Sequence, residues 1–191
     1  MAPSVDGILV ADSRINKHHA KQLAQIVPTV FLNSQTEQPE DFHFITIDDY
    51  LGARLAVEHL VSLGHTSIGY IGVGDKSKSN QQRLKGYQIA LSLAGLLQAN
   101  DCVAISDKDR EKINDVAVGQ QMLPKLLAAG VTGIFCYNDM IAVGALLACQ
   151  ELNISVPKDL SLVGFDGIAL SRYVIPILYE AALNKASRMK S

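Results

Sequence analysis

The sequence contains no tryptophan, and aromatic residues make up only 6% of its 191 positions. Charged residues are also few, at 19%, and they nearly balance to a formal net charge of −2. The lysines and arginines are scattered and form no basic stripe of the kind that a nucleic-acid backbone requires. We therefore expect no sequence-specific DNA binding by these residues themselves.

Long apolar runs are missing as well. The longest, such as Ile141–Cys149, fall well short of the ~20 residues that a membrane helix needs, so no membrane association is expected. The first residues have neither the basic region nor the apolar core of a signal peptide. The cysteines are widely spaced without a C-x-x-C pair, which favours free thiols in a reducing cytoplasm; they are Cys102, Cys136 and Cys149.

Signatures of catalysis and of cofactor binding are also absent. The stretch from Gly72 to Ser77 lacks the spacing of a phosphate-binding loop, and no G-x-G-x-x-G opens a helix after the first expected strand. No serine or cysteine lies in a nucleophile context such as G-x-S-x-G. The pair His18-His19 stands alone, without further metal ligands nearby. We expect a protein that is not an enzyme and that holds no cofactor and no metal.

What the sequence does contain is a regular alternation of apolar runs and amphipathic segments. The runs are continuous in apolar character, as in parallel strands covered on both faces, at Val5–Ala11, Thr29–Leu32, Phe44–Ile47, Ile68–Val73, Val103–Ser106, Gly133–Tyr137 and Ser161–Phe165. The amphipathic segments predict helices at Asp49–Leu63, Ser79–Leu97, Asp115–Ala129 and Asp139–Leu152. This order predicts an α/β fold with parallel sheets, whose ligands bind where the strands end.

Four stretches carry a more specific pattern. They are Ile47-Asp48-Asp49-Tyr50-Leu51-Gly52-Ala53 running on to Gly64-His65, Arg83-Leu84-x-Gly86-Tyr87, Phe135-x-Tyr137-Asn138-Asp139-x-Ile141-Ala142-x-Gly144, and Val156-Pro157-x-Asp159 running on to Gly164-Phe165-Asp166. In this order and at these separations they resemble the sensor domains of lactose/galactose-repressor-type transcription regulators. The resemblance extends from about Val5 to Pro176.

The resemblance implies two Rossmann-like lobes, like those of periplasmic binding proteins, with a sugar or related metabolite held between them. The family's effector contacts map onto Arg83, Asn138 and Asp166, and beyond these onto Tyr50, Asp49 and Asp75. These residue types suit a polyol, because arginine offers a fork of donors and the others exchange hydrogen bonds with hydroxyl groups. Taken singly, each also has a plainer interpretation as a surface arginine, a helix cap or a turn residue.

The implied function is allosteric sensing by a cytoplasmic, dimeric repressor, in which the effector controls operator binding. The operator would be contacted through a helix-turn-helix that this chain lacks, and the match fades after Pro176. We therefore expect two incomplete lobes, at residues 1–74 and 75–170, and a divergent tail at 171–191. Two alternatives stay open: a sugar-binding receptor of an uptake system, which shares the architecture, and a non-functional gene remnant.

Overall fold

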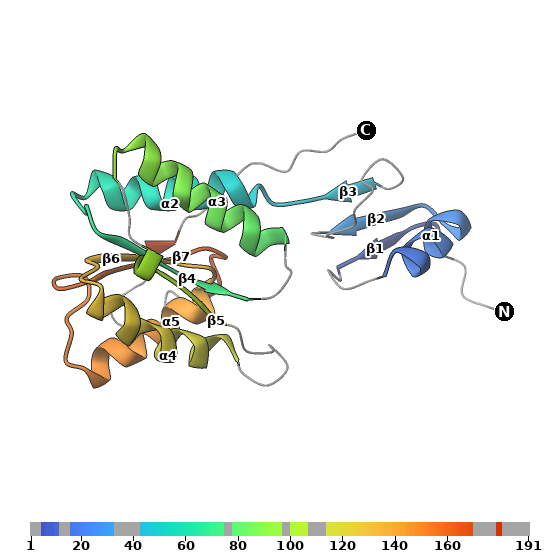
Figure 1. Ribbon diagram of the computed structural model, residues 1–191. Helices are drawn as coiled ribbons and strands as arrows, with labels where there is room; N and C mark the ends of the chain where they lie inside the picture. Colours follow the sequence, from blue (N-terminus) through green and yellow to red (C-terminus); the bar gives the residue numbers. More distant parts are fainter. Residues whose placement is uncertain are drawn as a thin grey trace. The chain divides into compact units, whose positions relative to one another are not determined.

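The computed structural model describes residues 5–11, 16–32, 43–74, 78–96, 100–106, 114–169 and 179–180. The chain divides between Asp48 and Asp49 into two compact units (Figure 1). Each unit has a sheet of its own, and every strand pair in both sheets is parallel. The predicted α/β fold with parallel sheets is confirmed.

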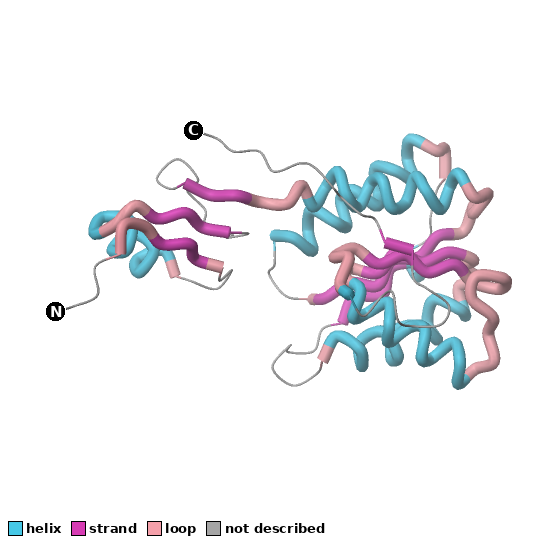
Figure 2. The backbone as a smooth tube through the Cα atoms, turned by 180° about the vertical axis from the view of Figure 1, so that it is seen from behind, coloured by secondary structure: helices cyan, strands magenta, loops and turns pink. Residues whose placement is uncertain are grey.

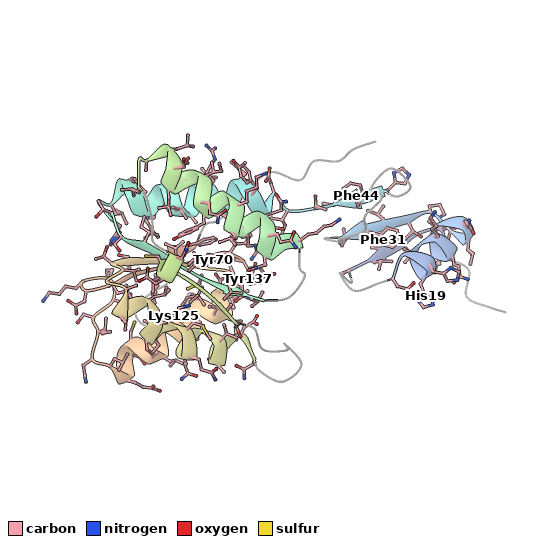
Figure 3. All side chains as sticks on the ribbon, viewed as in Figure 1. His19, Phe31, Phe44, Tyr70, Lys125 and Tyr137 are labelled. Atoms are coloured by element: carbon pink, nitrogen blue, oxygen red, sulfur yellow. The ribbon has the colours of Figure 1, made fainter. Side chains whose placement is uncertain are left out.

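The described residues of the first unit form a three-stranded sheet in the order β1-β2-β3 and one helix. Its elements are β1 (Ile8–Val10), α1 (Lys17–Ile26), β2 (Thr29–Leu32) and β3 (His43–Ile45). Helix α1 begins after Asn16, whose side chain accepts a hydrogen bond from the backbone N–H of His19 at 2.9 Å. The buried side chains of Ala20 and Phe31 form a small core, against which Phe44 packs (Figure 3).

The second unit contains a five-stranded sheet in the order β5-β4-β6-β7-β8. Its strands are β4 (Ile68–Val73), β5 (Val103–Ser106), β6 (Gly133–Cys136), β7 (Ser161–Gly164) and β8 (Tyr179–Glu180). All residues of β4 and β6 are buried, as expected for central strands covered on both faces. The continuous apolar runs predicted the first four strands, whereas the two-residue β8 was not predicted.

Two pairs of helices cover this sheet. They are α2 (Asp49–Ser62) with α3 (Lys78–Leu93) on one face and α4 (Asp115–Ala128) with α5 (Asp139–Glu151) on the other (Figures 1 and 2). After β4 the chain runs through α3 to β5, which pairs with one edge of β4. It then runs through α4 to β6, which pairs with the other edge of β4. Neighbouring strands β4 and β6 therefore continue into helices on opposite faces, the topology at which α/β proteins bind ligands.

The expected boundary at residue 74 is wrong, because the structure divides the chain between Asp48 and Asp49. Helix α2 and strand β4 follow the first unit directly in the sequence. Strand β4, however, pairs with β5 and β6 in the second sheet, and α2 packs against α3. The expected tail at 171–191 lies outside the described residues except for β8, which extends the second sheet.

Helices α4 and α5 pack closely because each has a glycine at the contact. A Cβ atom on Gly144 would overlap the carbonyl oxygen of Val116, and one on Gly119 would overlap the carbonyl oxygen of Ile141. In both cases the obstacle is backbone, which cannot turn aside as a flexible side chain would. The approach of the two helices therefore depends on glycine at both positions.

We expect Gly144→Ala to force the two helices apart and to lower the free energy of unfolding by about 3 kcal/mol, the upper range for overpacking. Urea denaturation of the variant and the wild type measures this difference. Gln82→Ala, on an exposed position of α3, is the control and should change stability by no more than about 0.5 kcal/mol. Equal stability of Gly144→Ala and wild type would contradict the close packing.

His65 connects the amino-terminal ends of two strands in the second unit. Its ring nitrogens lie 2.9 Å from the hydroxyl oxygens of Thr132 and Ser161, which precede β6 and open β7. Burial lowers the pKa of the His65 imidazole below its usual value. The folded protein therefore binds fewer protons at this site than the unfolded chain does, wherever the pH lies between the two pKa values.

We expect the stabilising contribution of His65 to be complete above the unfolded-state pKa of about 6.5 and to decline as the pH falls from there through the lower folded-state pKa. His65→Gln removes the titration but keeps a polar side chain. The difference in unfolding free energy between wild type and His65→Gln, measured with urea from pH 7.5 to 5, should therefore move against the wild type at lower pH. A difference that stays constant over this range would refute the expectation.

Candidate functional site

Arg83 lies in the second turn of α3, and only 4% of the residue is exposed. Its Nε donates a hydrogen bond to Oδ1 of Asp49 at 2.8 Å. Asp49 is the first residue of α2, and its side chain is 11% exposed. Because a buried charge is costly unless it is paired, this ion pair ties the start of α2 to α3.

The same guanidinium reaches the segments that follow β6 and β7. Its Nη1 donates to the carbonyl oxygen of Tyr137, the residue immediately after β6 (labelled in Figure 3), and lies 3.4 Å from Oδ1 of Asp166. Cζ of Arg83 is 3.5 Å from the ring centroid of Phe165 and 4.5 Å from that of Tyr137. Cation–π attraction to these rings adds to the charge pairing, so one side chain joins the exits of two strands.

Asn138 follows Tyr137 and caps α5. Its Oδ1 accepts from the backbone N–H of Ile141 at 2.9 Å, and its Nδ2 donates to Oδ2 of Asp115 at 2.6 Å. Asp115 is the first residue of α4, so Asn138 connects the beginnings of the two helices on this face. The capping interpretation of Asn138 is confirmed, and its amide also forms a contact between helices that the sequence did not predict.

Asp139, the first residue of α5, has no exposed surface. Its Oδ1 accepts from the backbone N–H of Phe165, and its Oδ2 from the backbone N–H of Ile168, both at 2.8 Å. These two amides lie on either side of Asp166 in the sequence. The Asp139 carboxylate therefore fixes the segment that carries Asp166.

The carboxyl group of Asp166 is subject to opposing influences. Burial raises its pKa above the usual value, while the neighbouring Arg83 guanidinium lowers it and the charges of Asp139 and Asp49 raise it. The side chain is still 39% exposed, so the carboxylate is open to a partner from solvent. Arg83, Asp49 and Asp166 form what we call the Arg83–Asp166 cluster, which is negatively charged overall when all three are ionised, and Asp139 adds a further negative charge near Asp166.

Of the two remaining predicted contact residues, Tyr50 is not joined to this cluster. Tyr50 lies half-buried on α2, next to Asp49, and its hydroxyl makes no hydrogen bond to any described residue. Asp75 falls outside the described residues. The structure thus brings Arg83, Asp49 and Asp166 into direct contact and places Asn138 beside the Tyr137 carbonyl.

Several members of this arrangement were not predicted as site residues: Tyr137, Asp139 and Phe165, together with Asp115. The first three lie inside the motifs that carry the family resemblance, directly beside Asn138 or Asp166. The available signal was position, because each follows a buried strand at the carboxyl edge of the sheet. Nothing in the local sequence distinguishes Asp115 from an ordinary first-turn acid.

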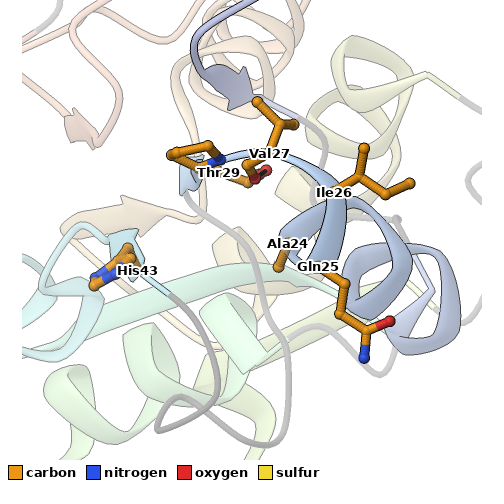
Figure 4. A pocket seen from close by; sticks show the side chains of 7 residues that line it. Ala24, Gln25, Ile26, Val27, Thr29 and His43 are labelled. Atoms are coloured by element: carbon orange, nitrogen blue, oxygen red, sulfur yellow. Dashed lines mark hydrogen bonds between the residues drawn. The ribbon is translucent and has the colours of Figure 1, made fainter.

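A separate cavity of about 430 Å³ lies in the first unit, at the turn from α1 to β2 (Figure 4). Its lining runs from Ala24 to Thr29 and includes His43 of β3. It contains none of the predicted contact residues and opens at the amino-terminal ends of β2 and β3, whereas ligands of parallel sheets bind at the opposite ends.

The described residues contain neither a group of metal ligands nor a membrane-spanning helix. No group of three or more His, Cys, Asp or Glu side chains among them is arranged to hold a metal ion. None of the helices in the described ranges has both the length and the apolar character needed to cross a membrane.

Known protein families and characterised relatives match this sequence. The profile of the family described as the periplasmic-binding-protein-like domain matches residues 57–185. The regulator GalR of Escherichia coli K12 is 38% identical over 136 residues, covering 70% of this chain and 38% of that protein. The ribose operon repressor of Haemophilus influenzae is 35% identical over 189 residues, covering 97% of this chain and 54% of that protein.

The fold is also similar to that of a solved regulator structure. The LacI-family regulator of Enterococcus faecium, determined with bound ribose, superposes with a TM-score of 0.77 at 27% identity, over 92% of this chain and 64% of that one. The chain thus spans about half the length, or less, of the curated relatives it matches.

We expect Arg83→Ala to leave the buried Asp49 carboxylate unpaired and to lower the free energy of unfolding by about 3 kcal/mol, as for other broken buried pairs. Arg83→Lys should lose less, because the ammonium keeps the charge but cannot reach all of the same acceptors. Urea denaturation at pH 7 measures both, with the exposed Lys85→Ala on the same helix as control. A stable Arg83→Ala would contradict the role assigned to this ion pair.

Proposed function

This chain belongs to the periplasmic-binding-protein-like sensor domains of LacI/GalR-type transcription regulators, and we propose that it senses a neutral sugar or related polyol through the Arg83–Asp166 cluster. The observation that carries this proposal is the buried Arg83, held at the carboxyl edge of the sheet beside an Asp166 that is still open to solvent. A donor and an acceptor side by side match the two hydrogen-bonding roles of a hydroxyl group.

The free hydrogen-bonding capacity of the cluster supports a polyol. Arg83 uses Nε and Nη1 for Asp49, Tyr137 and Asp166, and its Nη2 donates to no described residue. The two N–H groups of Nη2 are available to a ligand oxygen, and the Asp166 carboxylate can accept from a neighbouring hydroxyl. Asn138 is less available, because both ends of its amide already bind within the protein; we propose for it a supporting role beside the ligand.

The charge of the cluster argues for a neutral ligand. Asp49 already neutralises Arg83, and the carboxylates of Asp166 and Asp139 add negative charge nearby. A phosphate ester placed here would meet like charge, which costs binding energy at short range. Among the relatives, one is named as a ribose operon repressor and one was determined with bound ribose, which agrees with an uncharged polyol.

We further propose that this chain works within a cytoplasmic, homodimeric repressor whose operator is bound by a helix-turn-helix that is not among these 191 residues. The curated relatives named above are transcription regulators that extend well beyond the matched region. Effector binding can change operator affinity only if the effector binds the two states of the regulator differently. A sugar-binding receptor of an uptake system shares the architecture, but no feature of the Arg83–Asp166 cluster favours that function. No feature of the cluster favours an enzymatic function either.

Isothermal titration calorimetry of the full-length protein tests the proposal, with D-ribose, D-galactose and D-glucose against their phosphate esters. We expect at least one neutral sugar to bind more tightly than its ester, and Asp166→Asn to weaken that sugar about 10-fold or more through the lost charge-assisted bond. Lys85→Ala is the matched surface control. No binding by any neutral sugar, or tighter binding of the esters, would contradict the proposal.

A further inference from the structure

The Asp139 carboxylate binds the backbone that carries Phe165 and Asp166, the two residues after β7 that contact Arg83. It accepts one hydrogen bond from the backbone N–H of Phe165, whose ring packs 3.5 Å from Cζ of Arg83, and a second from the N–H of Ile168. Asp166 lies between these two amides in the sequence. A Cβ atom on Gly164 would overlap Oδ1 of Asp139, so the close approach of strand exit and carboxylate requires glycine there.

We propose that Asp139 is a positioning residue of the effector site, which holds the segment from Gly164 to Ile168 so that Phe165 and Asp166 meet Arg83. This role rests on the function proposed above for the Arg83–Asp166 cluster. It adds to that function a residue that contacts neither the guanidinium nor, on this geometry, the effector. Asp139 acts through the backbone on which the contact residues stand.

The electrostatic setting suits a carboxylate that accepts from backbone. Asp139 is fully buried and pairs with no described cation, so its charge is balanced by two N–H donors and by the amino terminus of α5. Hydrogen bonds to an ionised acceptor are about twice as strong as neutral ones, and the helix dipole favours negative charge at this end. An amide in its place would keep the shape but could accept only one of the two bonds.

A purely structural role is the competing explanation, since a buried carboxylate with two bonds also stabilises the fold. The two explanations differ in how the effects of Asp139 and Asp166 on effector affinity combine. If Asp139 acts through Asp166, its loss costs little once Asp166 is already removed. If Asp139 acts on the fold in general, the two losses add.

The experiment uses Asp139→Asn, Asp166→Asn and the double variant in the full-length protein, with D-ribose, D-galactose and D-glucose as calorimetric probes. The control is Asp159→Asn, which removes a carboxylate that also accepts a backbone bond, from Ser155 at 2.9 Å, but in an exposed loop before β7. We expect Asp139→Asn to weaken binding about 10-fold, the equivalent of one charged hydrogen bond. The double variant should bind no more than about 2-fold more weakly than Asp166→Asn, as expected for coupled residues.

Hydrogen exchange without any sugar supplies an independent measurement. The amides of Phe165 and Ile168 should exchange faster in Asp139→Asn than in wild type, and should be unchanged in Asp159→Asn. If Asp139→Asn does not fold, Gly164→Ala displaces the same contact from the other side while keeping the carboxylate, and the same exchange increase is expected.

The outcomes separate the two proposals. Unchanged exchange at both amides, or wild-type sugar affinity in Asp139→Asn, would overturn the positioning role even where a sugar binds. Additive losses in the double variant would reduce Asp139 to a structural residue. Failure of the wild type to bind any probe would instead remove the proposed function, and the positioning role with it, although faster exchange would still show that Asp139 holds this segment.

Discussion

The buried guanidinium of Arg83 is the constraint around which the second unit is arranged. Only 4% of the Arg83 residue is exposed, so its charge must find its partners within the protein. It finds them on three separate elements: Asp49 at the start of α2, the Tyr137 carbonyl after β6, and Phe165 with Asp166 after β7. Loss of Asp49 would leave this charge without its shorter ion pair, at 2.8 Å against 3.4 Å for Asp166.

The sheet topology makes this meeting possible. Helix α3 leaves β4 toward one face, while α5 leaves the neighbouring β6 toward the other, so the segments after both strands come together at one edge. Close helix packing supports the arrangement on both faces. A Cβ atom on Gly86 of α3 would overlap the Tyr50 carbonyl oxygen of α2, just as Gly119 and Gly144 allow contact between α4 and α5.

Acidic residues at the first positions of three helices position the other residues of the site. Asp49, Asp115 and Asp139 are the first residues of α2, α4 and α5, where the helix dipole favours a negative charge. Each uses this position for a different contact: Asp49 for Arg83, Asp115 for Asn138, and Asp139 for the backbone after β7. Charge at helix ends thus both stabilises the helices and orients the residues we propose for the effector.

Much of the fold could be predicted from the sequence because its signals are local. Continuous apolar runs marked β4 to β7, and helical spacing with caps such as Asn138 marked the helices between them. The boundary between the units could not be read in this way, since the assignment of β4 depends on pairing with β5 and β6, which follow it by about 30 residues or more in the chain.

For the site, too, some residues could be predicted from the sequence and others could not. The family resemblance supplied Arg83, Asp49 and Asp166, and their mutual contact spans up to 83 residues of sequence. Asp139 was missed because its two bonds reach 26 and 29 residues ahead; its position after a buried strand marked it as a candidate but does not reveal which backbone groups its carboxylate meets. Long-range backbone contacts of this kind are visible only once the strands are in register.

We infer that Asp49 already holds Arg83 in place before any effector arrives. The most direct measurement is the exchange rate of the Arg83 Nε–H with water in the sugar-free protein, followed by NMR. The partly exposed Arg54, paired with Glu58 on α2, is the internal reference. We expect the Arg83 Nε–H to exchange far more slowly than that of Arg54 and to lose this protection in Asp49→Asn. Equal exchange rates for the two arginines would contradict this inference.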